Sequence, residues 1–217
     1  MSELFDEVDE DVRRDQLKQI WDRYSIFIVA GAFLIVAAVG GWRGYDYLQM
    51  QKAVETGKAF DAAVELADQA KHAEAEAAYA KLAATAPSGY RMLARLREAA
   101  EVGSRDPQAA IKMYDDISAD RSIGTVEQDL AKIRAGGLLL ETATYPTMLQ
   151  RLEASTTPTA TFRHSARELL ALSAWRANDS TAARKWLDLI ANDGETPSGL
   201  RSRAEALQAL LPPVAKS

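Results

Sequence analysis

Residues 75–87 read AEAAYAKLAATAP. The pattern is a small residue, Ala75, followed four positions on by the ring of Tyr79 and three positions later by Leu82. Residues at these spacings lie on one face of an α-helix. Pro87 then marks the end of the helix, because proline cannot continue one. The stretch therefore predicts a short helix with one apolar face.

The same pattern recurs along the chain with a period near thirty-five residues. It is clear at Ala110, Tyr114 and Ile117. It appears again at Ala183, Leu187 and Ile190, after a predicted helix that contains Leu170, Ala171 and Ala174. A weaker unit between them has Gly136 with Leu139, then Met148 with Leu152. A fixed period of this length indicates stacked repeats. Pro and Gly separate the periodic stretches, and no stretch alternates as a strand does. We therefore predict helices of about 12 to 16 residues joined by short turns into antiparallel hairpins.

These positions resemble the core positions of a tetratricopeptide repeat (TPR), which implies a stack of helical hairpins. Residues 199–211 should form a final helix that caps the stack; another helical bundle is the alternative fold. In the second unit Arg97, Glu98 and Glu101 stand where the repeat has apolar or small residues, so its first helix should be slipped by one residue. The neighbouring Gly136 and Gly137 indicate close packing between helices.

An uncharged segment, residues 24–42, precedes the repeats and is bounded by Arg23 and Arg43. As a helix it would span roughly 28 Å at about 1.5 Å per residue, close to the thickness of the hydrocarbon core of a bilayer. Aromatic residues flank both ends, as at membrane interfaces. A buried core helix and a cleavable signal peptide are the alternatives, but the acidic leader is unlike the basic start of a signal peptide. We expect an uncleaved signal anchor.

The basic residues around this segment predict its orientation. Four Lys or Arg residues precede it within about fifteen residues and two follow it, which favours a cytoplasmic N-terminus. The expected division is an acidic leader at 1–23 in the cytoplasm, a transmembrane segment at 24–43 and a TPR-like domain at 44–217 in the periplasm of a bacterium. The predicted fold is thus all-α: a single transmembrane helix, then a TPR-like α-solenoid of about four helical hairpins plus a C-terminal capping helix.

Composition argues against several classes of function. The net charge is −5, without the basic excess that nucleic-acid binding needs. The chain has no cysteine, so it has no thiolate nucleophile and no zinc–thiolate site. His164 and Glu168 lie four residues apart, a spacing that could join two metal ligands, but without a third ligand a solvated helix pair is favoured. We expect no enzyme, no cofactor and no metal.

The leader FDEVDEDVRRDQLKQIWDRY (5–24), the single span and the degenerate TPR-like hairpins together resemble the YfgM-like family, ancillary subunits of the SecYEG translocon. The resemblance implies an inner-membrane protein with a periplasmic TPR-like domain. Its implied partners are the Sec translocon, a membrane-anchored periplasmic prolyl isomerase chaperone, and unfolded or emerging exported proteins. It brings no catalytic residues. A membrane-tethered TPR scaffold for another envelope process, such as division or cytochrome maturation, is the alternative function.

Two partner-binding surfaces are expected. The first helices of TPR hairpins line a groove, which should be mainly apolar and suited to extended apolar segments. The residues assigned to it are Phe60, Val64, Met92, Arg95, Ile133, Leu140, Leu172 and Trp175. In the transmembrane segment, the small residues Ala37, Gly40, Gly41 and Gly44 lie on one face, where a partner helix could approach closely.

Overall fold

A computed structural model describes residues 3–212 of the chain. By contacts the chain divides into two compact units, one up to Glu55 and one from Thr56 onward. The long helix α1 (Glu3–Asp68) supplies the first unit and contributes its last residues to the second.

Helix α1 is the one helix in the described part of the chain that is long and apolar enough to cross a membrane. Large apolar side chains of the first unit are exposed, including Phe27, Phe33, Val36 and Trp42. Apolar surface of this extent marks an interaction with lipid or with protein, because leaving it in water is costly.

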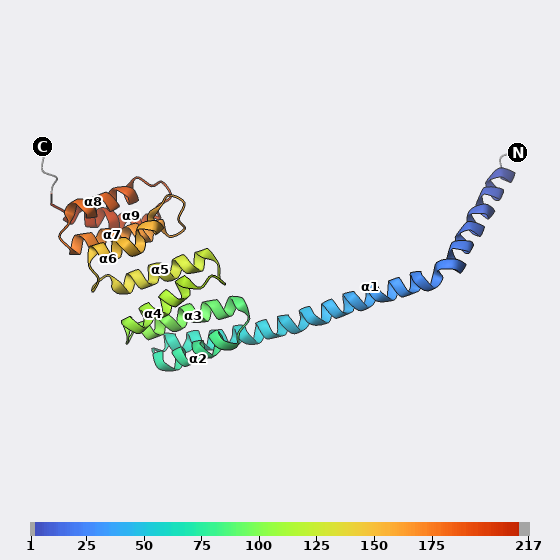
Figure 1. Ribbon diagram of the computed structural model, residues 1–217, viewed down its shortest axis with the longest axis horizontal. Helices are drawn as coiled ribbons and strands as arrows, with labels where there is room; N and C mark the ends of the chain where they lie inside the picture. Colours follow the sequence, from blue (N-terminus) through green and yellow to red (C-terminus); the bar gives the residue numbers. More distant parts are fainter. Residues whose placement is uncertain (1–2, 213–217) are drawn as a thin grey trace. The chain divides into compact units, whose positions relative to one another are not determined.

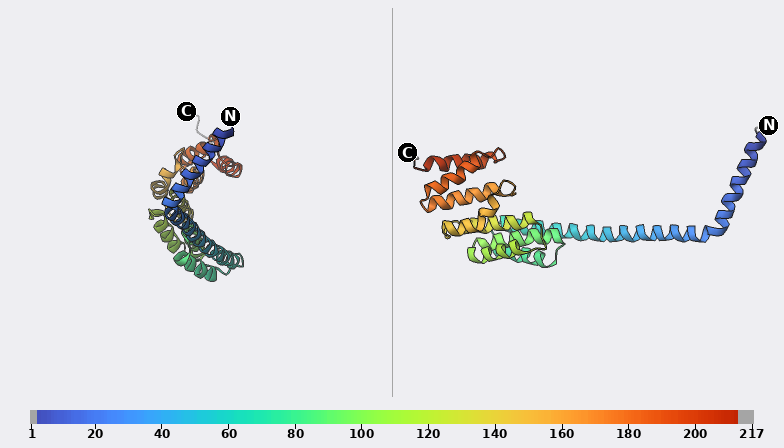
Figure 2. Two further views of the ribbon diagram at one scale, coloured as in Figure 1. Left: turned by 90° about the vertical axis from the view of Figure 1, so that its right-hand side faces the viewer. Right: turned by 45° about the horizontal axis from the view of Figure 1, so that its top comes forward.

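The regular secondary structure in the described residues of the second unit is helical. After α1 it contains α2 (His72–Thr85), α3 (Ser88–Gly103), α4 (Pro107–Ala119), α5 (Thr125–Leu139), α6 (Tyr145–Leu152), a short 3-10 helix η1 (Glu153–Thr156), α7 (Arg163–Arg176), α8 (Ser180–Ala191) and α9 (Ser198–Leu210). Consecutive helices from α2 to α9 pack against each other, and α7 also contacts α5 and α9. Figure 1 shows the pairs α3/α4, α5/α6 and α7/α8, and in the left view of Figure 2 they follow one another along an arc. The predicted all-α fold of helical hairpins with a final capping helix is confirmed.

Turn residues begin the second helices of two hairpins. The carboxylate of Asp106 accepts a hydrogen bond from the backbone N–H of Ala109 at 3.0 Å, and Pro107 occupies the first turn of α4. Asp179 accepts from the N–H of Ala182 at 2.9 Å at the start of α8. Both side chains satisfy a backbone donor that has no partner within the helix, which stabilises a helix start by about 1 kcal/mol.

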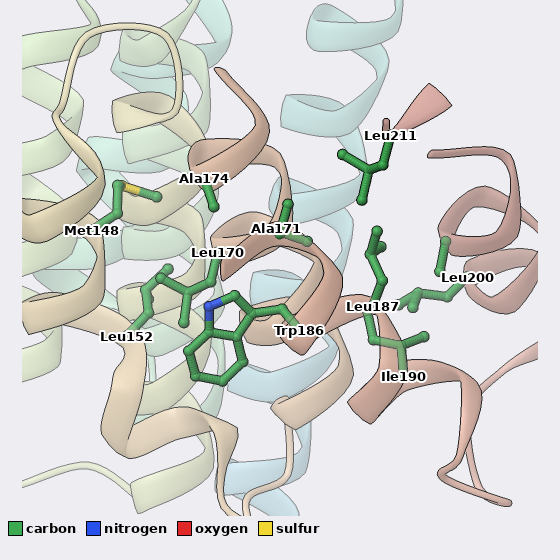
Figure 3. Close-up of a cluster of buried hydrophobic side chains, with 12 residues drawn as sticks. Met148, Leu152, Leu170, Ala171, Ala174, Trp186, Leu187, Ile190, Leu200 and Leu211 are labelled. Atoms are coloured by element: carbon green, nitrogen blue, oxygen red, sulfur yellow. The ribbon is translucent and has the colours of Figure 1, made fainter. Parts of the chain in front are cut away.

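The repeat residues form the core of each hairpin. In the first, Ala63, Ala75 and Tyr79 are buried together, and the Tyr79 ring lies 5.4 Å from the ring of Phe60 between centroids. Ala110, Tyr114 and Ile117 are buried in the second. Figure 3 shows the last cluster, in which Leu170, Ala171 and Ala174 of α7 lie near Trp186, Leu187 and Ile190 of α8. Small residues on one helix let the bulky side chains of the next fill the space beside them.

The second hairpin has the predicted slip. Ala99 and Val102 are buried, rather than their neighbours Glu98 and Glu101, so the repeat positions in α3 are displaced by one residue. Charged side chains are thereby kept out of the core, since burying an unpaired charge would be costly.

The third hairpin departs from the predicted helix length. Helix α6 has only 8 residues, fewer than the expected 12, and continues as the 3-10 helix η1. The chain then becomes extended at Thr157, because Pro158 disfavours a helical conformation of the residue before it. Met148 and Leu152 of α6 are nevertheless fully buried, as predicted for the weaker unit.

Candidate functional site

The first helices of three successive hairpins line a cavity of about 650 Å³ that is open to solvent. It lies on one face of α3, α5 and α7, which we call the inner face, and one residue of α4, Tyr114, also lines it. The lining residues are Ala100, Gly103, Tyr114, Leu130, Ile133, Arg134, Gly137, Leu138, Phe162, Ser165, Glu168 and Leu169. A volume of this size lies within the range of roughly 300 to 1,000 Å³ that is typical of ligand pockets.

The cavity exists because small residues stand where larger ones could fill it. Ala100 and Gly103 of α3 and Gly137 of α5 line it. A Cβ atom added to Gly137 would have no heavy atom within 4 Å, so this glycine faces open space. A Cβ atom at Gly103 would lie 3.3 Å from the Cβ atom of Ala110, so that glycine serves close packing instead. Gly137 is therefore the position at which a longer side chain could occupy the cavity without displacing its neighbours.

The adjacent glycines of α5 thus have opposite surroundings. A Cβ atom on the buried Gly136 would lie 3.0 Å from Leu152 Cδ1, which is the close helix packing that the sequence predicted. That interpretation was wrong for Gly137, which is exposed and lines the cavity. Neighbouring helical residues point about 100° apart, and here this difference separates a packing position from a cavity position.

The walls of the cavity are mainly apolar, with few polar groups. Glu168 forms a two-pronged ion pair with Arg203 of α9, at 2.6 and 3.0 Å, so its charge is compensated. The Tyr114 hydroxyl donates to the backbone carbonyl of Leu96 at 3.4 Å. Burial raises the pKa of Tyr114, while Arg134 and Arg97 oppose that rise. Tyr114 therefore remains a neutral phenol at physiological pH, and its hydroxyl group lies within the electrostatic reach of two arginines.

The residues assigned to a groove from the sequence fall into two groups. Ile133 of α5 lines the cavity. Leu140 directly after α5 and Leu172 of α7 are partly buried, and Trp175 of α7 is 45% exposed. Toward the start of the domain the side chains are more enclosed. Phe60 and Val64 pack against the core of the first hairpin, Met92 is buried in the second, and Arg95 forms an ion pair with Asp120 at 2.6 Å. The role of all eight in partner binding stays a prediction.

Sequence reasoning missed most of the cavity. Leu130 and Gly137 lie one turn before and one turn after Ile133, so the helical period from that residue could have found them. Ala100, Phe162, Ser165 and Leu169 have no such signal. Their place depends on how α3 and α7 pack beside α5.

His164 and Glu168 have separate partners. His164 Nδ1 lies 3.1 Å from the hydroxyl of Thr196, whereas Glu168 binds Arg203. The Thr196 hydroxyl donates to the carbonyl of Ile190 at 2.8 Å, so His164 Nδ1 must carry the proton of the His164–Thr196 hydrogen bond. Burial lowers the pKa of His164, and the nearby Arg163 lowers it further. The pair is divided between two structural contacts.

An ion-pair cluster surrounds Asp193 in the loop between α8 and α9. Its carboxylate accepts from Arg163 at 2.8 Å and from the buried Arg167 at 2.9 Å. These hydrogen bonds hold the pKa of Asp193 well below its usual range. Arg167 also donates to the carbonyl groups of Thr156 and Leu189, so it connects α7 to η1, to α8 and to the loop after α8. The cluster fixes the loop against α7.

In the first unit, Ala37, Gly40, Gly41 and Gly44 are exposed on α1. Cβ atoms added to these three glycines would meet nothing within 4 Å. The surface is open to close approach, and its role as a packing face stays a prediction.

The hairpins place small residues opposite bulky ones, and their stacked first helices line a cavity. These features define a TPR-like interaction module. A model of the tetratricopeptide repeat-like domain matches residues 18–186, more than half of the chain, and the chain belongs to this family. The match begins before the apolar segment of α1 and ends in α8. No curated protein and no solved structure matches the chain.

Proposed function

We propose that this protein is a membrane-anchored TPR-like interaction protein that acts as an accessory subunit of the Sec translocon. In this role it docks partners, or holds emerging exported proteins, on the inner face of its hairpin stack. The partners that the leader and architecture favour are the translocon itself and a membrane-anchored periplasmic prolyl isomerase chaperone. The protein would lie in the bacterial inner membrane, with residues 1–23 in the cytoplasm and residues 44–217 in the periplasm.

The observation that carries this proposal is the cavity on the inner face. TPR-like domains are interaction modules, and here three successive first helices leave a space of about 650 Å³ with mainly apolar walls. The cavity is open to solvent, so its apolar walls are in contact with water, which is unfavourable for the free protein. An apolar side chain of a partner would remove these walls from water, and this favours segments that are exposed before folding.

The anchor and its orientation are supported by the exposed apolar surface of α1 and by the basic residues that precede residue 24. Alkaline phosphatase fused after Ser217 should be active, because the enzyme matures only outside the cytoplasm. An inactive fusion, together with an active cytoplasmic reporter at the same position, would reverse the orientation and refute the periplasmic assignment.

The test of function uses a variant that fills the cavity. The full-length chain and its Gly137→Leu variant would be purified from detergent-solubilised membranes, and the bound proteins identified by mass spectrometry. Gly199→Leu is the matched control, since a Cβ atom there also meets nothing within 4 Å but the residue lies in α9, outside the cavity. We expect translocon subunits and the prolyl isomerase with the parent and control chains, and clearly reduced recovery with Gly137→Leu. Recovery of division or cytochrome-maturation proteins instead would refute the Sec assignment.

The small-residue face of α1 would add a second contact within the membrane. Lipid provides no hydrophobic drive for helix association, so close approach of backbones over Ala37, Gly40, Gly41 and Gly44 is one of the few sources of affinity. Replacing Gly40 and Gly41 with leucine should reduce partner recovery without affecting membrane insertion. Undiminished recovery would leave the inner face or the leader as the docking surface.

A further inference from the structure

The inner face continues beyond the cavity as an exposed apolar surface. Outside the first unit, five large apolar residues are well exposed: Leu93, Val126, Trp175, Leu189 and Leu210. Leu93 lies seven residues before the lining residue Ala100, and Val126 lies seven before Ile133. Positions seven apart share a helix face. Trp175 lies seven residues after Glu168, a lining residue of α7. Three of the five therefore extend the inner face on either side of the cavity.

This extent favours a segment of polypeptide over a small molecule. From Ser165 to Trp175 the inner face of α7 covers about 15 Å, at about 1.5 Å per helical residue. An extended chain covers about 3.3 Å per residue, so roughly five residues would match this length. The cavity would take one or two bulky side chains, and the flanking apolar residues would contact their neighbours in the segment.

The charges around the cavity are not balanced. Within the described chain, no carboxylate lies in ion-pair distance of Arg134, which lines the cavity, or of Arg97, one turn before Ala100 on α3. Both guanidinium groups act electrostatically on Tyr114. The acidic groups nearby already have partners, since Glu168 pairs with Arg203 and Glu101 contacts His72 at 2.7 Å. A protein of net charge −5 thus presents two arginines without an ion-pair partner beside an apolar cavity, although the Glu101 carboxylate opposes their effect on Tyr114.

We propose that the inner face binds a segment of a partner protein in which bulky apolar side chains alternate with Asp or Glu. The apolar side chains enter the cavity, and the carboxylates pair with Arg134 and Arg97. This inference rests on the proposed function, because it names the chemistry of the segment that the inner face takes. Opposite charges at the rim of an apolar site determine which partner binds and how its binding depends on salt, and they add only modest affinity.

Binding of labelled peptides would test the inference. The probes are three fluorescent peptides of equal length: one alternating phenylalanine with glutamate, one with lysine in place of glutamate, and one with alanine in place of phenylalanine. The protein is the full-length chain in lipid nanodiscs, with empty nanodiscs as the blank, and anisotropy is the readout. We expect the glutamate peptide to bind about three- to tenfold more tightly than the lysine peptide, and the preference to shrink as salt is raised. The alanine peptide should bind at least tenfold more weakly than the phenylalanine–glutamate peptide.

A charge reversal gives the sharpest comparison. Arg134→Glu should weaken binding of the glutamate peptide about five- to tenfold and strengthen that of the lysine peptide, whereas the Gly199→Leu control should leave both unchanged. Equal binding of the two peptides to the parent chain, or an unchanged preference in Arg134→Glu with unchanged helicity and melting, would overturn the inference.

The failure of the inference can be distinguished from that of the proposed function. If Gly137→Leu abolishes binding of both peptides equally while Arg134→Glu changes neither, the inner face is a docking surface without the acidic preference. If no peptide binds and the chain instead self-associates in a way that Gly137→Leu prevents, a second copy occupies the inner face and the inference is refuted.

Discussion

The two neighbouring glycines of α5 allow one chemical change to be made in opposite surroundings. Replacing a glycine with alanine inside a helix stabilises the helix by roughly 0.5 to 1 kcal/mol. At Gly137 nothing opposes this gain, because the new Cβ atom meets no atom within 4 Å. We expect Gly137→Ala to raise the free energy of unfolding by about that amount.

At Gly136 the same substitution forces a clash. The new Cβ atom would lie 3.0 and 3.3 Å from the two Cδ atoms of Leu152 and 3.5 Å from a Cδ atom of Leu169. Leu152 is fully buried, so it has little room to move. Overpacking of this kind costs about 1 to 3 kcal/mol, which exceeds the gain in helix propensity. Gly136→Ala should therefore lower the free energy of unfolding by up to about 2 kcal/mol.

The assay is urea unfolding of the full-length chain in detergent, followed by circular dichroism at 222 nm. Each variant serves as the control for the other, since the residue type, the helix and the substitution are the same. If both variants were stabilised equally, the orientation of α5 would be incorrect, and with it the assignment of Gly137 to the cavity.

Three further predictions concern the hairpin cores and the last loop. Tyr79→Ala should lower the free energy of unfolding by roughly 3 to 5 kcal/mol in the same assay, because the ring is buried against Phe60; a loss below about 1 kcal/mol would contradict the repeat register. Ser173→Ala should raise it by up to about 1 kcal/mol, since the buried hydroxyl has no hydrogen-bond partner in the described structure, and destabilisation would reveal one. Hydrogen bonds to arginine lower the pKa of Asp193 in the folded state, so the stabilising contribution of its carboxylate is present above about pH 4 and is lost as the pH falls. The melting temperatures of the parent and Asp193→Asn chains should therefore converge in acid. A difference that stays constant with pH would show that the ionisation of Asp193 does not stabilise the fold.

The repeat core could be predicted because it depends on spacing within single helices. Small and bulky residues three and four apart mark the side of each helix that faces its neighbours, and Tyr79, Tyr114 and Leu187 are all buried as that spacing requires. The slip in α3 was predictable for the same reason, because charged side chains at repeat positions signal that another register is used.

The cavity could not be predicted in this way, because it is a property of several helices together. It exists where Ala100 and Gly137 leave space between α3, α5 and α7, and no pattern within one helix shows which small residues will meet. Nor does spacing show whether an apolar residue near the inner face is exposed, as Trp175 is, or enclosed, as Met92 is. That outcome depends on the neighbouring hairpins.

Site-specific photocrosslinking in living cells would show directly whether partners dock on the inner face. A photoreactive amino acid would replace, one at a time, four exposed apolar residues: Val126 and Trp175, which flank the cavity, and Leu189 and Leu210 on α8 and α9. If partners dock on the inner face, Val126 and Trp175 should crosslink to the same protein, and Leu189 and Leu210 should not. Crosslinks confined to Leu189 and Leu210 would show that partners dock on α8 and α9 and not on the inner face.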